Sequence, residues 1–308
     1  MSGPDRPRTA TVRVAATSAN LGPGFDCLGL ALDLHDDVVV TPGDRADGDS
    51  VDVTVTGEGA GVLPADSRHL VARAVRVATD ALGHPRTPLS LTCTNRIPHG
   101  RGLGSSAAAV VAGLLAGRAL VPGGRDRMTD DAVLALACEL EGHPDNAAAC
   151  LLGGLTLAWA DGPDGPDVHA IRLELRPDLR ATALVPSTEL ATETSRGLLP
   201  ASVPHADAAH AAGRAALLVA ALTGVPHDGL LLAATEDRLH QGYREPAMPA
   251  TLALVAALRS AGQAAVVSGA GPTVLVLATG EAPAVTAPAG WRVLQLAPDR
   301  AAASVVVD

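Results

Sequence analysis

Hydrophobic positions along the chain repeat with two different periods. Strict alternation is typical of strands, whose successive side chains face opposite sides of a sheet, and apolar residues at every third or fourth position indicate helices. Strands are predicted over residues 11–16, 38–41, 51–56, 89–94, 151–159, 171–175, 181–185, 264–268, 273–278, 291–296 and 303–307. Helices are predicted over residues 70–82, 104–120, 130–140, 207–222, 228–239 and 249–261. Because strands and helices alternate in both halves, the pattern favours a layered α/β or α+β fold.

Two segments rich in glycine and proline interrupt these patterns. The stretch DGPDGPD, residues 161–167, is the best candidate for a linker, and it divides the chain into predicted domains over residues 1–163 and 164–308. In the segment 280–290, Pro283 and Pro288 lie between flanking glycines. We therefore expect no full helix there.

Composition points to a small-molecule ligand. Phe25, Trp159, Tyr243 and Trp291 are the only aromatic residues, so the core must consist of Ala, Val and Leu, and a base-stacking surface for nucleic acid is missing. The net charge of −10 argues against nucleic acid or a membrane surface as partner. The first residues lack an apolar signal region, and the longest apolar run, 107–120, is too short to span a bilayer. These features predict a cytoplasmic protein.

Reactive side chains are as informative by their absence as by their presence. The four cysteines form no CxxC pair, which predicts free thiols rather than a zinc site. All 23 Lys and Arg residues are arginines. Without lysine, neither Schiff-base chemistry nor a Walker A loop is available. A phosphate-binding protein built on this chain must hold phosphates in another way.

The sequence Pro98-His-Gly-Arg-Gly-Leu-Gly-Ser-Ser-Ala-Ala108 is the strongest local signal. It lies between a predicted strand and a predicted helix, and its glycines permit tight turns and close approach to a ligand. The helix that follows directs free N–H groups and its positive dipole end toward the loop, which makes an anion site. Ser105 and Ser106 add hydroxyls that can cap the helix or ligate Mg²⁺ beside a phosphate. A serine-capped turn without a ligand is the alternative for such a loop alone.

The whole string resembles the phosphate-binding loop of the GHMP kinases. Two further motifs of that family follow in the expected order, Thr17-Ser-Ala-Asn-Leu-Gly-Pro-Gly-Phe-Asp26 and Ser268-Gly-Ala-Gly-Pro-Thr273. The resemblance implies an α+β GHMP kinase fold, with a ribosomal-S5-domain-2-like N-terminal half and a ferredoxin-like C-terminal half. It also implies that the segment 268–273 braces the phosphate loop. ATP is the implied phosphoryl donor, with Mg²⁺ as cofactor.

Within this family, the chain is most similar to homoserine kinases. The similarity is carried by residues 17–32 and by Glu141-Gly-His-Pro-Asp-Asn146, Thr192-Glu-Thr-Ser-Arg-Gly-Leu-Leu-Pro200 and Tyr243-Arg-Glu-Pro-Ala-Met-Pro249. The implied reaction is the ATP-dependent phosphorylation of the L-homoserine hydroxyl to O-phospho-L-homoserine, a step of threonine biosynthesis. A GHMP kinase for another small hydroxylated metabolite and a non-catalytic ligand-binding regulator on the same fold are the alternatives. A homodimer is a candidate assembly.

The resemblance implies a role for individual residues. The carboxylate of homoserine requires cations, which Arg196 and Arg244 can supply, and its ammonium requires an acceptor such as Asp26. The complete implied set for the amino acid is Asn20, Asp26, His143, Arg196 and Arg244, and the implied catalytic set is Asn146, Thr192 and Arg196. The implied ATP site is Pro98, His99, Gly100, Arg101, Gly102, Leu103, Gly104, Ser105, Ser106, Ala107 and Ala108.

Three positions in the implied site carry alternatives or departures. Ser106 and Glu141 are the expected Mg²⁺ ligands, with Glu139 as a rival for Glu141. Other GHMP kinases, such as mevalonate kinase, place an aspartate base where Asn146 stands. We therefore expect Asn146 and Thr192 to orient the hydroxyl, with the neighbouring Asp145 as an alternative base. His69 stands where related enzymes often have an asparagine near the adenine.

Overall fold

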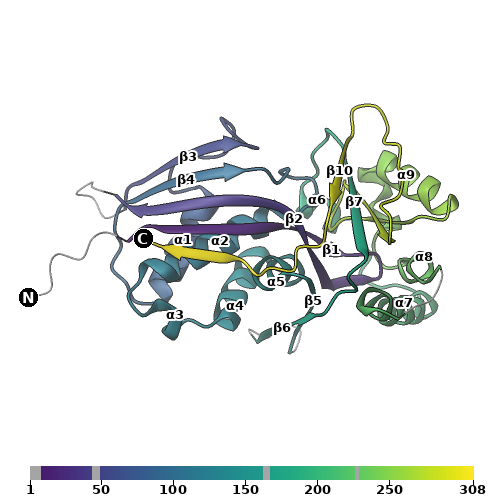
Figure 1. Cartoon of the computed structure of the whole chain (residues 1–308), viewed down its shortest axis with the longest axis horizontal. Coiled ribbons are helices and arrows are strands. Elements are labelled where there is room, and N and C mark those ends of the chain that lie inside the picture. Colours follow the sequence, from purple (N-terminus) through teal and green to yellow (C-terminus); the bar gives the residue numbers. More distant parts are fainter. Residues whose placement is uncertain (1–7, 44–48, 162–166, 226–228) are drawn as a thin grey trace, which may run out of the picture.

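The chain folds into two β-sheets with helices packed against them, as the computed structural model shows (Figure 1). The structure describes residues 8–43, 49–161, 167–225 and 229–308. Helices and strands occur in both halves, so the predicted α+β class is confirmed. In the described residues, no helix is both long enough and apolar enough to cross a membrane.

The first sheet has seven strands, and its centre is the long strand β2. The strands are β1 (Ala10–Asn20), β2 (Gly24–Pro42), β3 (Val51–Gly57), β4 (Leu89–Asn95), β5 (Leu155–Ala160), β6 (Val168–Leu173) and β11 (Ser304–Val307). Their order is β11-β1-β2-β4-β3, while β5 pairs with β2 and β6. One end of β2, residues 37–42, pairs with β4, and its other end, residues 28–30, pairs with β5. The turn between β1 and β2 is therefore carried beyond the body of this sheet.

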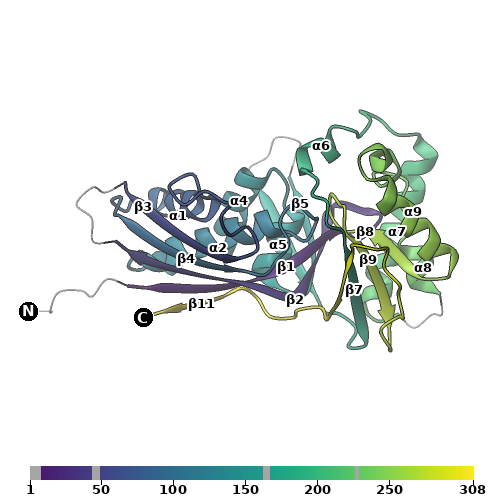
Figure 2. The ribbon, with the colours of Figure 1, turned by 90° about the horizontal axis from the view of Figure 1, so that it is seen from above.

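Helices cover one face of the first sheet (Figure 2). They are α1 (Leu70–Ala81), α2 (Ser105–Leu120), the short α3 (Gly124–Arg127), α4 (Asp130–Glu141) and α5 (Asp145–Leu152). In β1, the alternation of Val12 and Val14 with Arg13 directs the valines inward, and α2 is buried along most of its length because its residues are small and apolar. The resulting core consists of Ala, Val and Leu with few other residues, as composition predicted.

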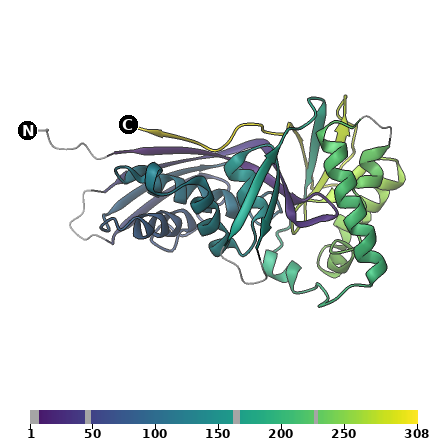
Figure 3. The ribbon, with the colours of Figure 1, turned by 90° about the horizontal axis from the view of Figure 1, so that it is seen from below.

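The second sheet has four strands in the order β10-β7-β9-β8. These are β7 (Leu179–Val185), β8 (Ala264–Val267), β9 (Val274–Thr279) and β10 (Arg292–Leu296). Helices α7 (His205–Thr223), α8 (Leu230–Ala234) and α9 (Pro249–Ser260) lie on this side of the molecule (Figure 3). The short α6 (Thr192–Arg196) contacts the 3₁₀ helix η1 (Gly242–Ala247). These two short elements carry Arg196 and Arg244 toward the first sheet.

Three predicted elements differ from the structure. Residues 24–42 form one strand where only 38–41 were predicted. The predicted strand 151–159 is divided, because α5 runs to Leu152 and β5 begins after Gly153 and Gly154. The predicted helix 228–239 ends at Ala234, and its first residue lies outside the described residues. The Asp237 carboxylate accepts hydrogen bonds from the backbone amides of residues 239–241, which gives this segment a local alternative to a helix.

The predicted linker lies mostly outside the described residues, which omit 162–166. The strands on either side of it, β5 and β6, pair as an antiparallel hairpin in the first sheet. The last strand, β11, also returns to this sheet beside β1. The division into domains at residues 163 and 164 stays a prediction. Residues 280–291 contain no helix, as the prolines predicted.

Candidate functional site

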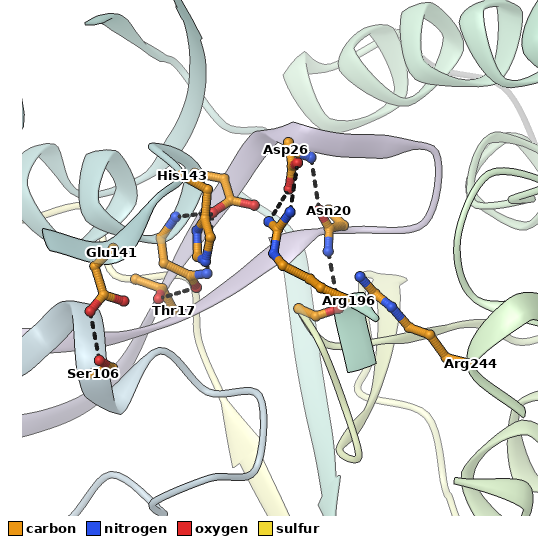
Figure 4. A network of polar contacts seen from close by, with 11 residues as sticks. Thr17, Asn20, Asp26, Ser106, Glu141, His143, Arg196 and Arg244 are labelled. Carbon is orange, nitrogen blue, oxygen red and sulfur yellow. Dashed lines mark hydrogen bonds and ion pairs between the residues drawn. The ribbon is translucent and has the colours of Figure 1, made fainter. Parts of the chain in front are cut away.

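A cavity of about 320 Å³ lies where the first sheet, α2 and the two short elements meet. Residues far apart in the chain line it, and most of them belong to the predicted site. The lining residues are Ala19, Asn20, Gly100, Arg101, Gly102, Gly104, Ser105, Ser106, Ala107, Leu140, Glu141, His143, Asp145, Asn146, Leu190, Thr192, Arg196, Arg244, Gly269 and Ala270. Figure 4 shows Ser106 and Glu141 on one side of this region and the arginines with Asp26 on the other.

The loop between β4 and α2 requires glycine at two positions. Gly104 precedes α2 with φ +70°, and a Cβ there would clash with Thr17 Oγ1. A Cβ on Gly102 would clash with the Ser268 carbonyl oxygen. No side chain caps α2, so its first amides are free to meet a ligand. The arrangement suits an anion, because the helix dipole also favours negative charge at this end.

Residues 268–273 brace this loop from the second sheet, as the sequence motif predicted. Ser268 Oγ donates a hydrogen bond of 2.6 Å to the Gly102 carbonyl oxygen, and the Thr273 amide donates to the Arg101 carbonyl oxygen at 3.3 Å. The Arg101 guanidinium bonds the backbone carbonyls of residues 186 and 187. The loop is therefore fixed in place before any ligand binds.

Ser106 and Glu141 lie in direct contact on one side of the cavity. Ser106 Oγ donates a hydrogen bond of 2.6 Å to Glu141 Oε1. Burial raises the pKa of Glu141, an effect that the Ser106 hydrogen bond opposes. Within the described ranges, no cluster of three or more His, Cys, Asp or Glu side chains could hold a metal by itself. One carboxylate and one hydroxyl nevertheless fit Mg²⁺, which keeps several waters and binds nucleotide phosphates.

The Asp145 carboxylate contacts two of the residues that follow α4. Its side chain is 2% exposed, and its Oδ1 accepts a hydrogen bond from the Asn146 amide at 2.7 Å and lies 2.9 Å from His143 Nδ1. Burial lowers the pKa of His143, but the hydrogen bond and charge of Asp145 outweigh burial and raise it. Asn146 Oδ1 in turn accepts from Thr17 Oγ1 at 2.7 Å. The Asn146 side chain is thus held between β1 and α5.

Asp26 and Arg196 form a two-pronged ion pair. Arg196 Nη1 and Nη2 donate to the two carboxylate oxygens of Asp26 at 3.1 and 2.5 Å. Asn20 closes the turn between β1 and β2, because its side-chain oxygen accepts from the Asp26 amide and its Nδ2 donates to the Gly269 carbonyl oxygen. Asn20, Leu21 and Asp26 all have φ between 50° and 68°, a strained conformation for residues other than glycine. Such strain is typical of functional sites.

Arg244 is the largest fully buried side chain in the described residues, at 1% exposure. Its Nη1 lies 3.0 Å from His240 Nδ1 and donates to the Gly269 carbonyl oxygen at 3.0 Å, while its Nε is buried without a partner. Burial and the nearby Arg196 lower the pKa of Arg244 to about 10. No carboxylate in the described part of the chain pairs with Arg244. A buried cation without such a partner is costly, so the site favours an incoming anion.

A second cavity of about 310 Å³ adjoins the phosphate loop, and the two cavities share Gly100, Ser105 and Ser106. His69, the N-cap of α1, lines this second cavity and is 4% exposed. Its Nδ1 accepts from the Val71 amide, and its Nε2 is buried without a partner. Burial lowers the pKa of His69, so the neutral ring offers an Nε2–H donor to the cavity.

Most of the predicted site residues lie on the two cavities. His99 and Ala108 line the second cavity rather than the first, whereas Pro98 and Leu103 line neither. Thr192 lines the first cavity. Asp26 does not line it but binds Arg196, which does. Glu139, the rival of Glu141, lies on the exposed side of α4. Sequence reasoning missed Thr17 and His240 as partners of site residues, although both lie inside or close to the motifs.

Family models match both halves of the chain. Residues 69–154 match the GHMP kinases N terminal domain, and residues 218–292 match the GHMP kinases C terminal domain. The chain is 54% identical over 310 residues to a homoserine kinase of Streptomyces avermitilis, with 99% of each chain covered. It is 49% identical to a homoserine kinase of Rhodococcus erythropolis, with 94% of this chain and 93% of the relative covered.

Solved structures agree with this assignment. The crystal structure of homoserine kinase from Cytophaga hutchinsonii matches with a TM-score of 0.79 and 26% identity, over 99% of each chain. A putative homoserine kinase from Listeria monocytogenes matches with a TM-score of 0.69 and 30% identity, over 96% of this chain and 99% of that one. The fold predicted from the motifs is therefore confirmed. With these matches over nearly its full length, the chain belongs to the GHMP kinase family and, within it, to the homoserine kinases.

Proposed function

We propose that this chain transfers the γ-phosphoryl group of ATP to the hydroxyl of L-homoserine, giving ADP and O-phospho-L-homoserine, a step toward threonine. The observation that carries the proposal is the juxtaposition of two kinds of charge site on one cavity. The uncapped start of α2 suits phosphate, and the Asp26–Arg196 pair beside Arg244 suits a zwitterion. An amino acid, which bears both an ammonium and a carboxylate, matches one anion and two cations.

On the donor side, the loop amides and the start of α2 receive the phosphates. The neighbouring cavity that contains His69 is apolar over much of its lining and adjoins the loop, which suits the nucleoside. His69 Nε2–H is placed to donate to a nitrogen acceptor of the base. Since the loop is fixed by Ser268 and Arg101, the phosphates meet a preorganised site.

On the acceptor side, the ammonium of homoserine replaces the Arg196 guanidinium as a partner of Asp26. The carboxylate of homoserine then receives hydrogen bonds from Arg196 and Arg244. The ion pair in the structure holds both groups near the positions that a zwitterion requires. Asn20 holds the turn that carries Asp26, and His143 contributes a further donor on the cavity wall.

The attacking hydroxyl is oriented rather than deprotonated in advance. Asn146 cannot act as a carboxylate base, and Asp145 accepts hydrogen bonds from its neighbours instead. Phosphoryl transfer passes through a loose transition state in which positioning and charge neutralisation matter most. Asn146 and Thr192 orient the hydroxyl oxygen as it bonds to the γ-phosphorus. The bond from the γ-phosphorus to the bridging oxygen of ADP breaks, and the hydroxyl proton passes to an oxygen of the transferred phosphoryl group and from there to water.

Ser106 and Glu141 would hold Mg²⁺ beside the phosphates. When bound, the ion neutralises charge on the transferred group. Burial raises the pKa of Glu141, and a bound cation would oppose this effect. The two side chains contribute oxygens that already lie 2.6 Å apart. Their proximity also argues against a non-catalytic regulator, which would not need this pair.

An ADP-release assay tests the proposal. The purified chain with ATP and Mg²⁺ is expected to turn over L-homoserine, and L-serine, L-threonine and mevalonate are expected to react far more slowly. Serine has the same charged groups with a shorter hydroxyl arm, whereas mevalonate lacks the ammonium. Turnover of mevalonate above that of homoserine would move the assignment to another branch of the family.

A further inference from the structure

His240 lies behind the site, at a place where two parts of the amino-acid pocket meet. Its ring is fully buried and packs at 5.2 Å from the ring of Phe25. Its backbone is held by the Asp237 carboxylate, and the next residue, Gln241, accepts a hydrogen bond from the Val267 amide through Oε1. The ring position is therefore fixed by neighbours on both sides.

The partners of the His240 ring select one tautomer. Nε2 lies 2.7 Å from the Gly22 carbonyl oxygen, which can only accept, so Nε2 carries the proton. Nδ1 lies 3.0 Å from Arg244 Nη1, which can only donate, so Nδ1 is the acceptor. Burial and the Arg244 charge lower the pKa of His240, and Asp237, whose Oδ1 lies 3.8 Å from Nε2, only partly opposes this. The ring is thus neutral, with each nitrogen assigned.

This tautomer determines how the Arg244 guanidinium is presented. Both hydrogens of Nη1 are occupied, one by His240 Nδ1 and one by the Gly269 carbonyl oxygen. Nε is buried without a partner. Among the described residues, the hydrogen bonds of the guanidinium all start from Nη1, so Nη2 has no partner there. The Nε–Nη2 edge is one of the edges that bind a carboxylate through two parallel hydrogen bonds. That edge is left free.

We propose that His240 is a positioning residue for the acceptor amino acid, because its Nδ1 holds Arg244 with this carboxylate-binding edge free. The same ring bonds Gly22, in the turn that joins β1 to β2 and carries Asn20 and Asp26. The ring therefore lies between the cation that would bind the carboxylate and the turn that would bind the ammonium. The inference rests on the proposed function, since it needs an acceptor that bears both charges.

Two substitutions separate the two bonds of the ring. His240→Asn places an amide oxygen near the position of Nδ1 and retains an acceptor for Arg244. His240→Gln places its amide near the position of Nε2 and retains the donor to Gly22 but leaves Nη1 without its acceptor. We expect His240→Gln to raise KM for L-homoserine about tenfold with kcat changed less than about threefold, as for the loss of one charge-assisted hydrogen bond. His240→Asn is expected to stay within about threefold of the parent KM.

A truncated acceptor supplies the control. 3-Amino-1-propanol is homoserine without its carboxylate, so the two variants are expected to use it as well as the parent does. The inference is overturned if His240→Gln leaves KM for homoserine unchanged, if it weakens both acceptors equally, or if His240→Asn is the poorer variant. Turnover of homoserine by the parent chain tests the proposed function separately, so the two failures are distinct.

If the variants do not fold, a measurement on the parent chain still tests the inference. Nitrogen NMR of ¹⁵N-histidine-labelled protein at pH 7 reports which ring nitrogen of His240 carries the proton, with the peak assigned by three-bond couplings. We expect a neutral ring with a protonated Nε2 and a bare Nδ1. A charged ring, or a proton on Nδ1, would remove the acceptor for Arg244 and overturn the inference.

Discussion

Arg196 and Asp26 satisfy one another across the candidate site, with hydrogen bonds of 3.1 and 2.5 Å between the guanidinium and the carboxylate. Each group is also the expected partner of one charge of homoserine. In the proposed binding mode, homoserine exchanges one ion pair for two, and neither charge would be left alone in the partly buried cavity. Such an exchange limits the desolvation cost of binding a zwitterion.

Asp26→Asn tests the ammonium side of this exchange. The variant retains a hydrogen-bonding oxygen but loses the negative charge, so KM for homoserine is expected to rise about 10- to 100-fold. 4-Hydroxybutanoate, which is homoserine without its amine, is the matched acceptor, and its slow turnover is expected to be unaffected. Steady-state kinetics with both acceptors distinguish the roles. Equal losses for both acceptors would assign Asp26 to the structure of the turn alone.

Gly104→Ala tests the phosphate loop. The new Cβ would meet Thr17 Oγ1 and displace the start of α2, so ATP affinity measured by calorimetry is expected to fall at least about tenfold. Gly123 is a matched control, because it also precedes a helix, with φ +66°, and a Cβ added there would have nothing within 4 Å. Gly123→Ala is expected to cost about 1 kcal/mol of unfolding free energy and to leave ATP affinity unchanged. Equal ATP affinity in the two variants would contradict the assignment.

Glu141→Gln tests the proposed Mg²⁺ site. The concentration of Mg²⁺ at half-maximal activity is expected to rise at least about tenfold, whereas Glu139→Gln, two residues earlier on the exposed side of α4, is expected to behave as the parent. Because burial raises the pKa of Glu141, the carboxyl takes up a proton at a higher pH than an ordinary glutamate. Activity at limiting Mg²⁺ should therefore fall as the pH drops through this raised pKa, and saturating Mg²⁺ should move the fall to lower pH. A stronger effect of Glu139→Gln would assign the Mg²⁺ ligand to Glu139 instead of Glu141.

Asn146→Ala tests whether the hydroxyl is oriented by an amide. We expect kcat to fall about 10²-fold with little change in KM for ATP, since misplacement of the attacking oxygen mainly affects the chemical step. Thr17→Val removes the hydrogen bond that holds Asn146 Oδ1, and a smaller loss in the same direction is expected. Full kcat in Asn146→Ala would show that another group, such as Asp145, positions the hydroxyl.

The hydrophobic pattern predicted most of the helices and strands because the residues that determine each element lie within it. The alternation in β1 and the small apolar residues of α2 depend only on neighbouring residues. The helix expected over 228–239 failed because a single side chain, Asp237, bonds the following amides. The length of β2 was missed because pairing with β1 along most of its course overrides the glycines and aspartates in its sequence.

Sequence motifs predicted the candidate residues that lie within them. Pairings between residues from distant segments were missed, because only the fold brings those residues together. The pairing of Asp26 with Arg196 joins residues 170 positions apart, and only the fold brings them together. Thr17 and His240 act on Asn146 and Arg244 through one hydrogen bond each. Their residue types alone do not distinguish such contacts from ordinary packing. The homodimer stays a prediction from the family resemblance.

Phosphorus NMR of the reaction products tests the central claim most directly. The purified chain is incubated with ATP, Mg²⁺ and L-homoserine, and the product phosphorus is correlated with the protons of the carbon that bears it. We predict one new phosphomonoester whose phosphorus couples to the γ-methylene protons of homoserine, formed in equal amount with ADP. Release of ADP with inorganic phosphate alone, or a phosphorus on any other group of the acceptor, would contradict the account.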